Sequence, residues 1–207
     1  MGRSREKTAG LVLAAGTSSR MGATKQLLRI GGKLLVERAV EEALKSNLDQ
    51  VVLVLGHRAG TIRNALASSL KDTRLRVVEN RGYRNGMGSS IRTAIREVED
   101  HVEHVMILLA DMVHIDAHVI NALLEGYLAS GKSLGAVCVR GRRSHPVILE
   151  RKWYAALHDL REDAGARALF DAFADEVCLV AAPFGYDDLD LDTPEDYRKA
   201  LQETVEE

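Results

Sequence analysis

Four short apolar runs mark the first half of the chain, and stretches with helical periodicity separate them. The apolar runs are residues 11–13, 51–55, 75–78 and 105–109. Their length and their content of branched apolar residues are typical of buried strands. The helical stretches, which keep apolar side chains on one face, are residues 35–44, 62–70 and 91–98. Because strands and helices alternate, this pattern predicts a mostly parallel sheet with helices on both faces.

The second half of the chain is less regular. Asp116 is placed to cap a helix that runs through Leu128, because an aspartate side chain can accept a hydrogen bond from a free N–H group at a helix start. Two apolar runs joined by residues 140–144 predict a hairpin-like unit, which we expect to lie over the ligand crevice. The predicted strands are residues 135–139, 147–149 and 177–180, and the predicted helices are residues 153–160 and 166–173.

A last helix start is strongly marked near the end of the chain. Thr193 can act as the N-cap, Pro194 fits the first helical position, and Asp196 is the acid three residues after the cap. With the other elements, this helix completes a single α/β domain over residues 1–207. We expect a three-layer α/β/α sandwich with a mostly parallel central sheet and a small antiparallel addition in the second half.

The composition is that of an ordinary globular protein. The chain has 207 residues, of which 46% are hydrophobic and 28% are charged, and its formal net charge is −2. The absence of a long basic run argues against nucleic acid as a partner. No segment reaches the roughly 20 apolar residues that a membrane helix needs, and the polar first residues do not resemble a signal peptide. We therefore expect a cytoplasmic protein that acts on small molecules.

The two cysteines, Cys138 and Cys178, both lie in apolar runs. Buried free thiols in a reducing cytoplasm are favoured over a disulfide bond. No spacing of cysteines and histidines indicates a zinc site.

A loop of small residues follows the first predicted strand and carries the strongest chemical signal in the chain. Residues 13–22 are Leu-Ala-Ala-Gly-Thr-Ser-Ser-Arg-Met-Gly, and Lys25 comes three residues later. Small side chains let an anion approach backbone N–H groups closely, and fixed cations then neutralise the charge of a phosphate. The pattern therefore predicts a triphosphate site rather than an ordinary turn between a strand and a helix.

Two commoner phosphate loops do not fit this stretch. A Walker loop has four residues between its glycines and a lysine directly after the second, whereas five residues separate Gly16 from Gly22 and Ala23 follows. A dinucleotide-binding fingerprint needs a second glycine at the position of Ser18.

The pattern Leu-Ala-Ala-Gly-x-Ser-x-Arg-Met-Gly-x-x-Lys resembles the signature of nucleotidyltransferases with a Rossmann-like fold. Within them, the chain is most similar to the molybdenum cofactor cytidylyltransferases. Further motifs extend the resemblance from about residue 9 to about residue 201, and they are Gly86-Met87-Gly88-Ser89-Ser90, Ala110-Asp111-Met112, His145-Pro146-Val147, Asp163-Ala164-Gly165-Ala166-Arg167 and Asp190-Leu191-Asp192-Thr193-Pro194-Glu195-Asp196. The resemblance implies an enzyme that transfers CMP from CTP to a phosphorylated, molybdopterin-type acceptor and releases pyrophosphate.

The resemblance also implies a division of the chain and a set of site residues. The nucleotide-binding half covers about residues 8–112, and the acceptor-binding half covers about residues 113–201. The expected catalytic residues are Lys25, Arg20 and Asp111. The expected nucleotide-binding residues are Leu13, Ala14, Ala15, Gly16, Ser18, Ser19, Arg20, Met21, Gly22, Lys25, Gly86, Met87, Ser89 and Ser90. For the last four of these, a plain helix start is the alternative interpretation.

Acidic residues at two places indicate a magnesium site. Asp111 follows the most apolar strand, where a carboxylate is costly to bury unless it is paired or bound to a metal. Mg²⁺ takes one or two carboxylates together with phosphate oxygens. Asp190 and Asp192 alternate with leucines, so an extended segment would place both on one face. We expect Asp111 and Asp190 to be ligands and Asp192 to be a helping ligand or a helix cap; for Asp111, a strand-end cap is the alternative.

The acceptor side is marked less sharply. His145, Pro146, Gly165 and Arg167 are the candidates, and Arg167 could pair with a phosphate through two parallel hydrogen bonds. An ordinary surface role is the alternative for His145 and for Arg167. A molybdoenzyme or its insertion chaperone is the candidate protein partner that the resemblance suggests.

The choice of base follows from the resemblance alone. The Leu-Ala-Ala-Gly start looks like that of the cytidylyl branch, whereas guanylyl-transferring relatives tend to start with Gly-Gly. The alternatives that stay open are another nucleotide, a sugar or alcohol phosphate as acceptor, guanylyl transfer to molybdopterin, and a noncatalytic nucleotide-binding or cofactor-delivery protein.

Overall fold

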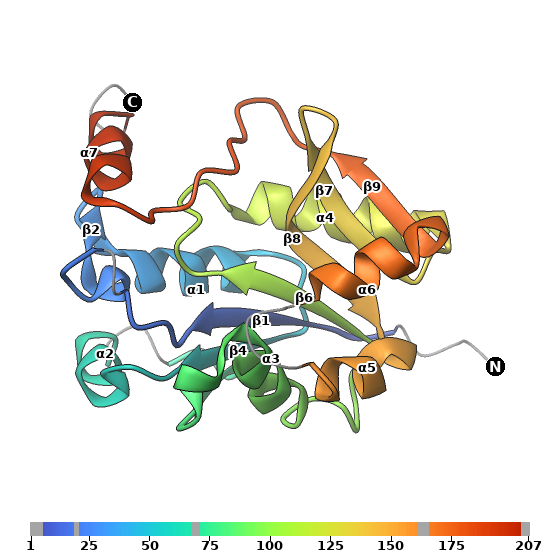
Figure 1. The fold of residues 1–207 in the computed structure, drawn as a ribbon, viewed down its shortest axis with the longest axis horizontal. Helices are drawn as coiled ribbons and strands as arrows, with labels where there is room; N and C mark the ends of the chain where they lie inside the picture. The colour runs from blue at the N-terminus through green and yellow to red at the C-terminus, as the bar shows by residue number, and fades with distance from the viewer. Residues whose placement is uncertain (1–5, 19–20, 68–70, 161–165, 204–207) are drawn as a thin grey trace.

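A seven-stranded sheet forms the centre of the molecule (Figure 1). The computed structural model describes residues 6–18, 21–67, 71–160 and 166–203. The strand order is β5-β4-β1-β6-β8-β7-β9, and neighbouring strands are parallel except where β8 pairs with β6 and β7. The strands are β1 (Thr8–Ala14), β4 (Gln50–Leu55), β5 (Leu75–Glu79), β6 (His104–Leu109), β7 (Leu134–Val139), β8 (Arg142–Glu150) and β9 (Val177–Ala181).

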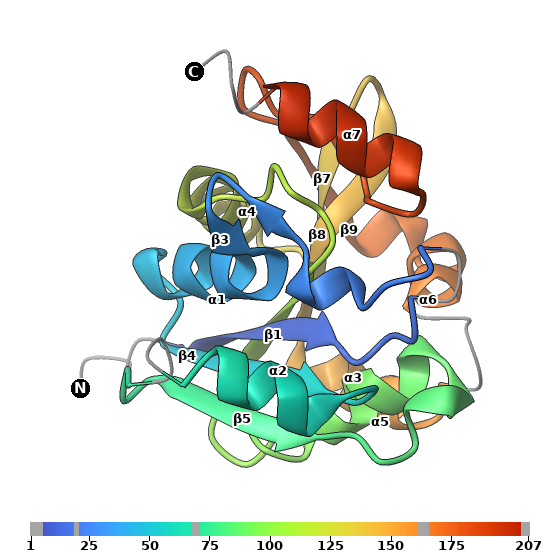
Figure 2. The same cartoon turned by 90° about the vertical axis from the view of Figure 1, so that its left-hand side faces the viewer.

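Helices cover both faces of this sheet (Figures 1 and 2). The first face carries α1 (Leu35–Lys45), α2 (Ala59–Ala65) and α4 (Ala117–Ser130), and the second carries α3 (Met87–Ile95), α5 (Tyr154–His158) and α6 (Arg167–Ala172). The last helix, α7 (Pro194–Glu203), packs with the start of α1 in a third, smaller core. The predicted three-layer sandwich, with one antiparallel strand from the second half of the chain, is confirmed.

Burial of side chains on both faces explains why β1 forms at the centre of the sheet. Leu11 and Val12 are both fully buried, and consecutive side chains of a strand point to opposite faces. Leu11 therefore enters the core under α3, and Val12 enters the core under α1. Burying each of them stabilises the fold by about 1.5–3 kcal/mol. A strand that is covered on both faces needs the continuous apolar run seen in the sequence.

Both predicted helix starts in the second half are confirmed. At the start of α4, Asp116 Oδ1 accepts a hydrogen bond of 2.8 Å from the N–H group of Val119. At the start of α7, the Thr193 N–H and hydroxyl groups donate to Asp196 Oδ2 at 2.7 and 2.8 Å, and the Asp196 N–H group donates to Thr193 Oγ1 at 3.2 Å. This reciprocal arrangement is a capping box. The cap is therefore Thr193, and the interpretation of Asp192 as the cap is wrong.

The hairpin of β7 and β8 occupies a different place from the one predicted. We expected it over the ligand crevice, but β8 pairs with β6 and thus both strands belong to the central sheet. The reason is that the edge of β6 would remain unpaired without a further strand, and β8 carries an apolar segment that can pair with it.

The helical pattern predicted for residues 62–70 is only partly confirmed in α2. Ala65 is exposed instead of facing the core, and Leu70 lies outside the described residues.

A small hairpin follows the glycine loop, and the sequence patterns did not predict it. It consists of β2 (Arg29–Ile30) and β3 (Lys33–Leu34), joined by Gly31 and Gly32. These glycines have φ values of 57° and 81°, as a two-residue hairpin turn of mirror-image type requires. The Gly-Gly pair was therefore a usable signal for this hairpin.

Two predictions about the class of protein can be compared with the structure. Cys138 and Cys178 are free thiols, as expected, but both are half-buried rather than buried. In the part of the chain that the structure describes, no helix combines the length and the apolar character needed to cross a membrane.

Gly56, directly after β4, allows a close approach of three parts of the chain. A Cβ atom at this position would lie 2.6 Å from Tyr83 Cβ and 2.8 Å from both the Cβ atom and the carbonyl oxygen of Ala15. The N–H group of His57 donates to the same carbonyl oxygen at 3.1 Å. The end of β4 can therefore contact the glycine loop only because residue 56 has no side chain.

We expect Gly56→Ala to lower the free energy of unfolding by about 1–3 kcal/mol, because neither Ala15 nor Tyr83 can yield without a backbone shift. In thermal unfolding this corresponds to a decrease in Tm of about 2–4 °C per kcal/mol. Gly60→Ala is the matched control, since a Cβ atom on this exposed residue of α2 would meet nothing within 4 Å. Alanine favours helices over glycine, so the control should keep or raise Tm, and equal Tm values for the two variants would contradict the prediction.

Candidate active site

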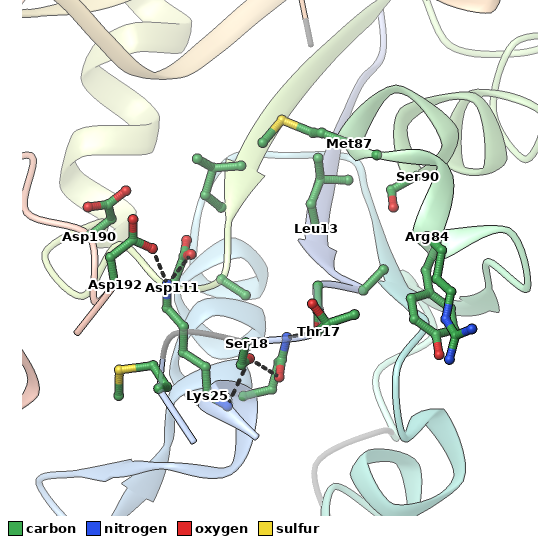
Figure 3. A pocket seen from close by; sticks show the side chains of 18 residues that line it. Leu13, Thr17, Ser18, Lys25, Arg84, Met87, Ser90, Asp111, Asp190 and Asp192 are labelled. Carbon is green, nitrogen blue, oxygen red and sulfur yellow. Dashed lines mark hydrogen bonds and ion pairs between the residues drawn. The ribbon is translucent and has the colours of Figure 1, made fainter. Parts of the chain in front are cut away.

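A pocket of about 670 Å³ opens at the carboxyl ends of β1 and β6 (Figure 3). Ligands of open parallel sheets bind at this edge. Its walls come from the glycine loop after β1, from η2 (Tyr83–Asn85) with the start of α3, and from the segment that precedes α7. Acidic side chains lie on one side of the pocket, and the side chains around the start of α3 lie on the other (Figure 3).

The glycine loop is held in shape by Gln26, which is only 7% exposed. Gln26 Nε2 donates to the Gly16 carbonyl oxygen at 3.1 Å, and its Oε1 accepts from Ser18 Oγ at 3.3 Å. Ser18 Oγ also accepts from the backbone N–H group of Lys25 at 3.1 Å. Ser18 has a φ value of 56°, which residues other than glycine rarely adopt. These hydrogen bonds therefore stabilise a loop conformation that is unfavourable by itself.

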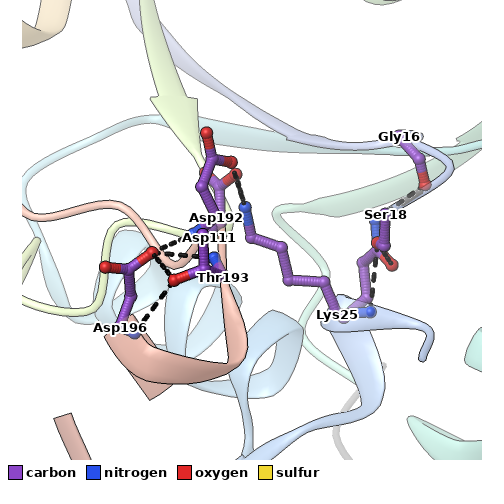
Figure 4. Close-up of polar contacts among 8 residues, drawn as sticks. Gly16, Ser18, Lys25, Asp111, Asp192, Thr193 and Asp196 are labelled. Atoms are coloured by element: carbon purple, nitrogen blue, oxygen red, sulfur yellow. Dashed lines mark hydrogen bonds and ion pairs between the residues drawn. The ribbon is translucent and has the colours of Figure 1, made fainter. Parts of the chain in front are cut away.

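Lys25 is the central cation of the described pocket. It begins η1 (Lys25–Leu27), and its side chain is only 9% exposed. Its Nζ lies 2.7 Å from Asp111 Oδ2 and 3.1 Å from Asp192 Oδ1 (Figure 4). Burial alone would lower the pKa of Lys25, but the two carboxylates outweigh burial and raise this pKa above its ordinary value. Lys25 is therefore positively charged at neutral pH.

The segment before α7 returns the chain to the pocket. The Leu191 N–H group donates to the Asp111 carbonyl oxygen at 3.2 Å, and Asp190 forms an isolated antiparallel bridge with Met112. Leu191 is fully buried in the third core, whereas Asp190 and Asp192 line the pocket. The predicted alternation of this segment is thus confirmed, although the segment is too short to form a regular strand.

Negative charge exceeds positive charge on the acidic side of the pocket. Three carboxylates gather there around Lys25, and they belong to Asp111, Asp190 and Asp192. Burial raises the pKa of Asp190, and the neighbouring carboxylates raise it further. The described residues contain no group of three or more His, Cys, Asp or Glu side chains arranged to hold a metal ion. The described carboxylates therefore do not by themselves form a complete set of metal ligands.

The opposite wall is organised by Asn80, which is 4% exposed. Its Nδ2 donates to Ser89 Oγ at 2.8 Å and to Ser90 Oγ at 3.1 Å, and its Oδ1 accepts from the Gly82 N–H group at 2.9 Å. Gly86 precedes α3 with φ 80° and ψ 178°, a conformation that is essentially restricted to glycine. The side-chain amide and the glycine together set where α3 begins relative to the pocket.

Most of the predicted site residues meet at this pocket. Those that line it are Leu13, Ala15, Gly16, Ser18, Met21, Lys25, Gly86, Met87, Ser90, Asp111, Asp190 and Asp192. Ala14, Gly22 and Ser89 do not line it; Ala14 lies in the core, and Ser89 Oγ donates to the Gly86 carbonyl oxygen at 2.8 Å. The predicted residues outside the described part of the chain are Ser19, Arg20 and Gly165.

Sequence reasoning missed several residues of the lining, namely Thr17, Gln26, Tyr83, Arg84, Leu109 and Ala110. Thr17 and Ala110 lie inside motifs that were recognised, so their neighbours in the sequence could have indicated them. Tyr83 and Arg84 stand just before the Gly86 motif, on a turn that no periodic pattern marks. Nothing in the sequence indicates that Gln26 holds the glycine loop.

The predicted acceptor residues that the structure describes do not line the pocket. His145 and Pro146 lie on β8; burial lowers the pKa of His145, and its Nδ1 is buried with no hydrogen-bond partner among the described residues. Arg167 is exposed at the first position of α6. Their role as acceptor contacts therefore stays a prediction that the geometry of the pocket does not support.

Comparison with known proteins places these features in a family. Residues 10–177 match the family model described as MobA-like NTP transferase domain. The nicotine blue oxidoreductase of Paenarthrobacter nicotinovorans is 31% identical over 167 residues, which are 76% of this chain and 78% of that protein. The purine catabolism protein PucB of Bacillus subtilis is 28% identical over 196 residues, which are 91% of this chain and 93% of that protein.

Solved structures agree with this match. Rv0371c of Mycobacterium tuberculosis superposes with a TM-score of 0.83 at 27% identity, over 96% of this chain and 99% of that chain. The same protein in complex with manganese superposes with a TM-score of 0.79 at 25% identity, over 96% of this chain and 100% of that chain.

The matched segment contains the glycine loop, Lys25, Asp111 and the wall at the start of α3. These are the parts that a nucleotidyl transfer needs: backbone donors for phosphates, a buried cation, and carboxylates beside it. The predicted family resemblance is confirmed at the level of the superfamily and its MobA-like branch. The chain belongs to the MobA-like NTP transferase family and is a nucleotidyltransferase with a Rossmann-like fold.

Proposed function

We propose that this enzyme transfers CMP from CTP to a phosphorylated, molybdopterin-type acceptor, releases pyrophosphate and depends on Mg²⁺. The observation that carries the proposal is the position of Lys25, buried between Asp111 and Asp192 in a pocket of about 670 Å³ beside the glycine loop. A buried ammonium group next to backbone N–H groups suits the phosphates of a nucleotide. A pocket of this volume is within the range of sites for small organic ligands.

Nucleotidyl transfer depends on positioning and charge neutralisation more than on a protein nucleophile. In the proposed reaction, an oxygen of the acceptor phosphate attacks the α-phosphorus of the nucleotide in line with the leaving pyrophosphate. The acceptor phosphate is already ionised at neutral pH, so no general base is required. The glycine loop, Lys25 and Arg20 would hold the leaving pyrophosphate and stabilise the negative charge that develops on it.

The acidic side of the pocket fits a magnesium ion by its chemistry. Mg²⁺ in nucleotide sites takes one or two carboxylates and completes its shell with phosphate oxygens and water, so Asp111 and Asp190 form a sufficient protein donor set. A cation would also relieve the repulsion that raises the pKa of Asp190. When bound, Mg²⁺ would neutralise charge on the phosphates. A solved structure of the related Rv0371c is a complex with manganese, which prefers the same oxygen ligands.

Lys25 would change partners when a nucleotide binds. In the structure, its ammonium group contacts Asp111 at 2.7 Å and Asp192 at 3.1 Å. Phosphate oxygens could replace these carboxylates, because they carry the same charge and lie within reach of a lysine side chain. Loss of the lysine partner then leaves Asp111 with uncompensated charge. Binding of the nucleotide and binding of a divalent cation should therefore favour each other.

The base and the acceptor in this proposal follow from the resemblance of the sequence. The Leu-Ala-Ala-Gly start favours a cytidylyl transfer by resemblance, and His145 and Arg167 are the proposed acceptor contacts with a molybdoenzyme or its insertion chaperone as recipient. The two curated relatives have names that refer to other substrates. Another nucleotide, a sugar or alcohol phosphate, and guanylyl transfer to molybdopterin therefore stay as alternatives.

The nucleotide can be identified by its effect on thermal unfolding. A ligand that binds only the native state raises Tm, and we expect CTP with Mg²⁺ to raise Tm more than GTP, ATP or UTP does. Release of pyrophosphate with CTP and a phosphorylated pterin then tests the transfer itself. A larger increase in Tm with another nucleotide would identify that nucleotide as the substrate instead of CTP. Absence of pyrophosphate release with every nucleotide and acceptor class would favour a noncatalytic role.

Lys25→Ala should lower turnover about a hundredfold or more, because loss of one group that stabilises the developing charge typically costs ~3 kcal/mol. Steady-state pyrophosphate release measures this effect, and circular dichroism verifies the fold. Lys33→Ala is the matched control, since Lys33 is an exposed lysine on β3 that does not line the pocket. Wild-type turnover in a folded Lys25→Ala protein would contradict the proposed role.

Asp190→Asn should raise the Tm of the ligand-free enzyme at neutral pH and weaken its binding of Mn²⁺ or Mg²⁺. When the pKa of a carboxyl group is raised in the folded state, its ionisation lowers the stability of the fold as pH rises through that pKa. An amide does not ionise and causes no such loss. The gain in Tm should therefore disappear below about pH 3.9, the ordinary pKa of aspartate. Titration calorimetry measures the affinity for the metal ion. Asp100→Asn is the control, because Asp100 is exposed and does not line the pocket. A lower Tm with unchanged metal affinity would show that Asp190 has a structural role instead.

A further inference from the structure

Asn80 holds its side-chain amide in one defined orientation. Its Oδ1 lies 2.9 Å from the Gly82 nitrogen, and a backbone N–H group can only donate. The oxygen must therefore face Gly82, and the amide nitrogen must face Ser89 and Ser90. This contact removes the usual ambiguity between the oxygen and the nitrogen of an asparagine side chain.

The two serines differ in whether the hydrogen of the hydroxyl group already has an acceptor in the protein. Ser89 Oγ accepts from Asn80 and donates to the Gly86 carbonyl oxygen at 2.8 Å or to the Gly82 carbonyl oxygen at 3.1 Å. Ser90 Oγ accepts from Asn80 at 3.1 Å, and no hydrogen-bond acceptor for its own hydrogen lies among the described residues. Ser90 lines the pocket and Ser89 does not. The free hydrogen of Ser90 is therefore the one that a ligand can meet.

We propose that Asn80 is a positioning residue that makes Ser90 a hydrogen-bond donor toward the bound nucleotide. Since the amide of Asn80 occupies a lone pair of Ser90 Oγ, the hydroxyl hydrogen is left for an acceptor on the ligand. A carbonyl oxygen or an unprotonated ring nitrogen accepts the Ser90 hydrogen, whereas an N–H or NH₂ group at the same place can use only the remaining lone pair and leaves that hydrogen without an acceptor. Such a buried mismatch is a strong basis for discrimination.

The place of Ser90 indicates which part of the ligand it meets. Ser90 lies with Met87 and Arg84 across the pocket from the acidic side (Figure 3). Because the phosphates belong beside Lys25, the nucleoside belongs beside Ser90, and this step rests on the proposed function. Asn80 itself does not line the pocket. Its influence on the ligand must therefore pass through Ser90.

Asn80→Asp tests the direction of this hydrogen bond. The substitution keeps the size of the side chain and the oxygen that accepts from Gly82, but an ionised carboxylate cannot donate to Ser90. Ser90 would then turn its hydrogen toward the carboxylate and present an oxygen to the ligand. At pH 8 we expect the Kd for CTP with Mg²⁺, measured by titration calorimetry, to rise about tenfold or more, whereas Ser90→Ala should raise it about threefold to tenfold.

A double-mutant cycle separates positioning from a general loss of structure. If Asn80 acts through Ser90, Asn80→Asp should have almost no further effect on Kd in the Ser90→Ala background. Thr93→Ala is the matched control, because Thr93 lies on the same helix but does not line the pocket. The substitution removes a hydroxyl group that donates to the Ser89 carbonyl oxygen. It should change neither Kd nor the coupling.

The pH dependence gives a second readout that a structural role would not produce. A protonated carboxyl group can donate to Ser90 again, so the ratio of the Kd of Asn80→Asp to that of wild type should decrease as pH falls. If Asn80→Asp does not fold, as judged by its Tm, Asn80→Ala replaces it in the cycle and must show the same coupling to Ser90→Ala.

The outcomes distinguish this inference from the proposed function. Absence of binding of any nucleotide by the wild type would overturn both. Binding by the wild type together with an unchanged Kd in Asn80→Asp, or with additive effects in the cycle, would overturn the role of Asn80 alone. A pH-independent ratio of the two Kd values would likewise overturn it.

Discussion

The ion pairs of Lys25 with Asp111 and Asp192 are the interaction on which the active side of this molecule depends. Removing charges from water costs several kcal/mol for each ion, and the cost is offset only if the partners lie in good geometry. The three residues come from the start of η1, from the turn after β6 and from the segment before α7. Segments that are far apart in the sequence must therefore be held together in a defined geometry.

The scaffold around this cluster provides the required rigidity. Gly56 lets β4 contact the glycine loop, Gln26 fixes the loop itself, and the capping box at Thr193 fixes the first turn of α7. Leu191 anchors the acidic segment in a small core with residues of β2, α1 and α7. Each of these contacts is modest alone, but together they limit where the carboxylates can be. These contacts between protein groups organise the pocket, which reduces the reorganisation that binding and catalysis require.

The pocket has two chemically different sides, and this difference separates the common part of the reaction from the specific part. In the proposed function, the acidic side and the glycine loop would bind the phosphates, which every nucleoside triphosphate shares. The wall at the start of α3 offers a hydroxyl group, an apolar methionine and an arginine. Relatives with different names match most of this chain at 28% and 31% identity, and on a common fold the side chains of the site, not the sheet, determine function.

The amino-acid sequence by itself determined where the parallel strands, most of the helices and the glycine loop lie along the chain. Continuous apolar runs and period-3.6 patterns of apolar residues report burial directly, and Asp116 and Thr193 mark helix starts by local hydrogen bonding that needs no tertiary contact. Gly16 and Asp111 could be found for the same reason, since each comes shortly after an apolar run, whereas Asp190 and Asp192 stand out because they alternate with leucines.

Only the tertiary structure decided how these residues are paired. It placed Lys25 between Asp111 and Asp192, moved the β7–β8 hairpin into the sheet, and kept Arg167 away from the pocket. It also revealed Gln26 and Asn80, whose importance lies in hydrogen bonds to residues 8 to 10 positions away. Such contacts depend on the three-dimensional distance between side chains, which periodicity along the chain does not encode.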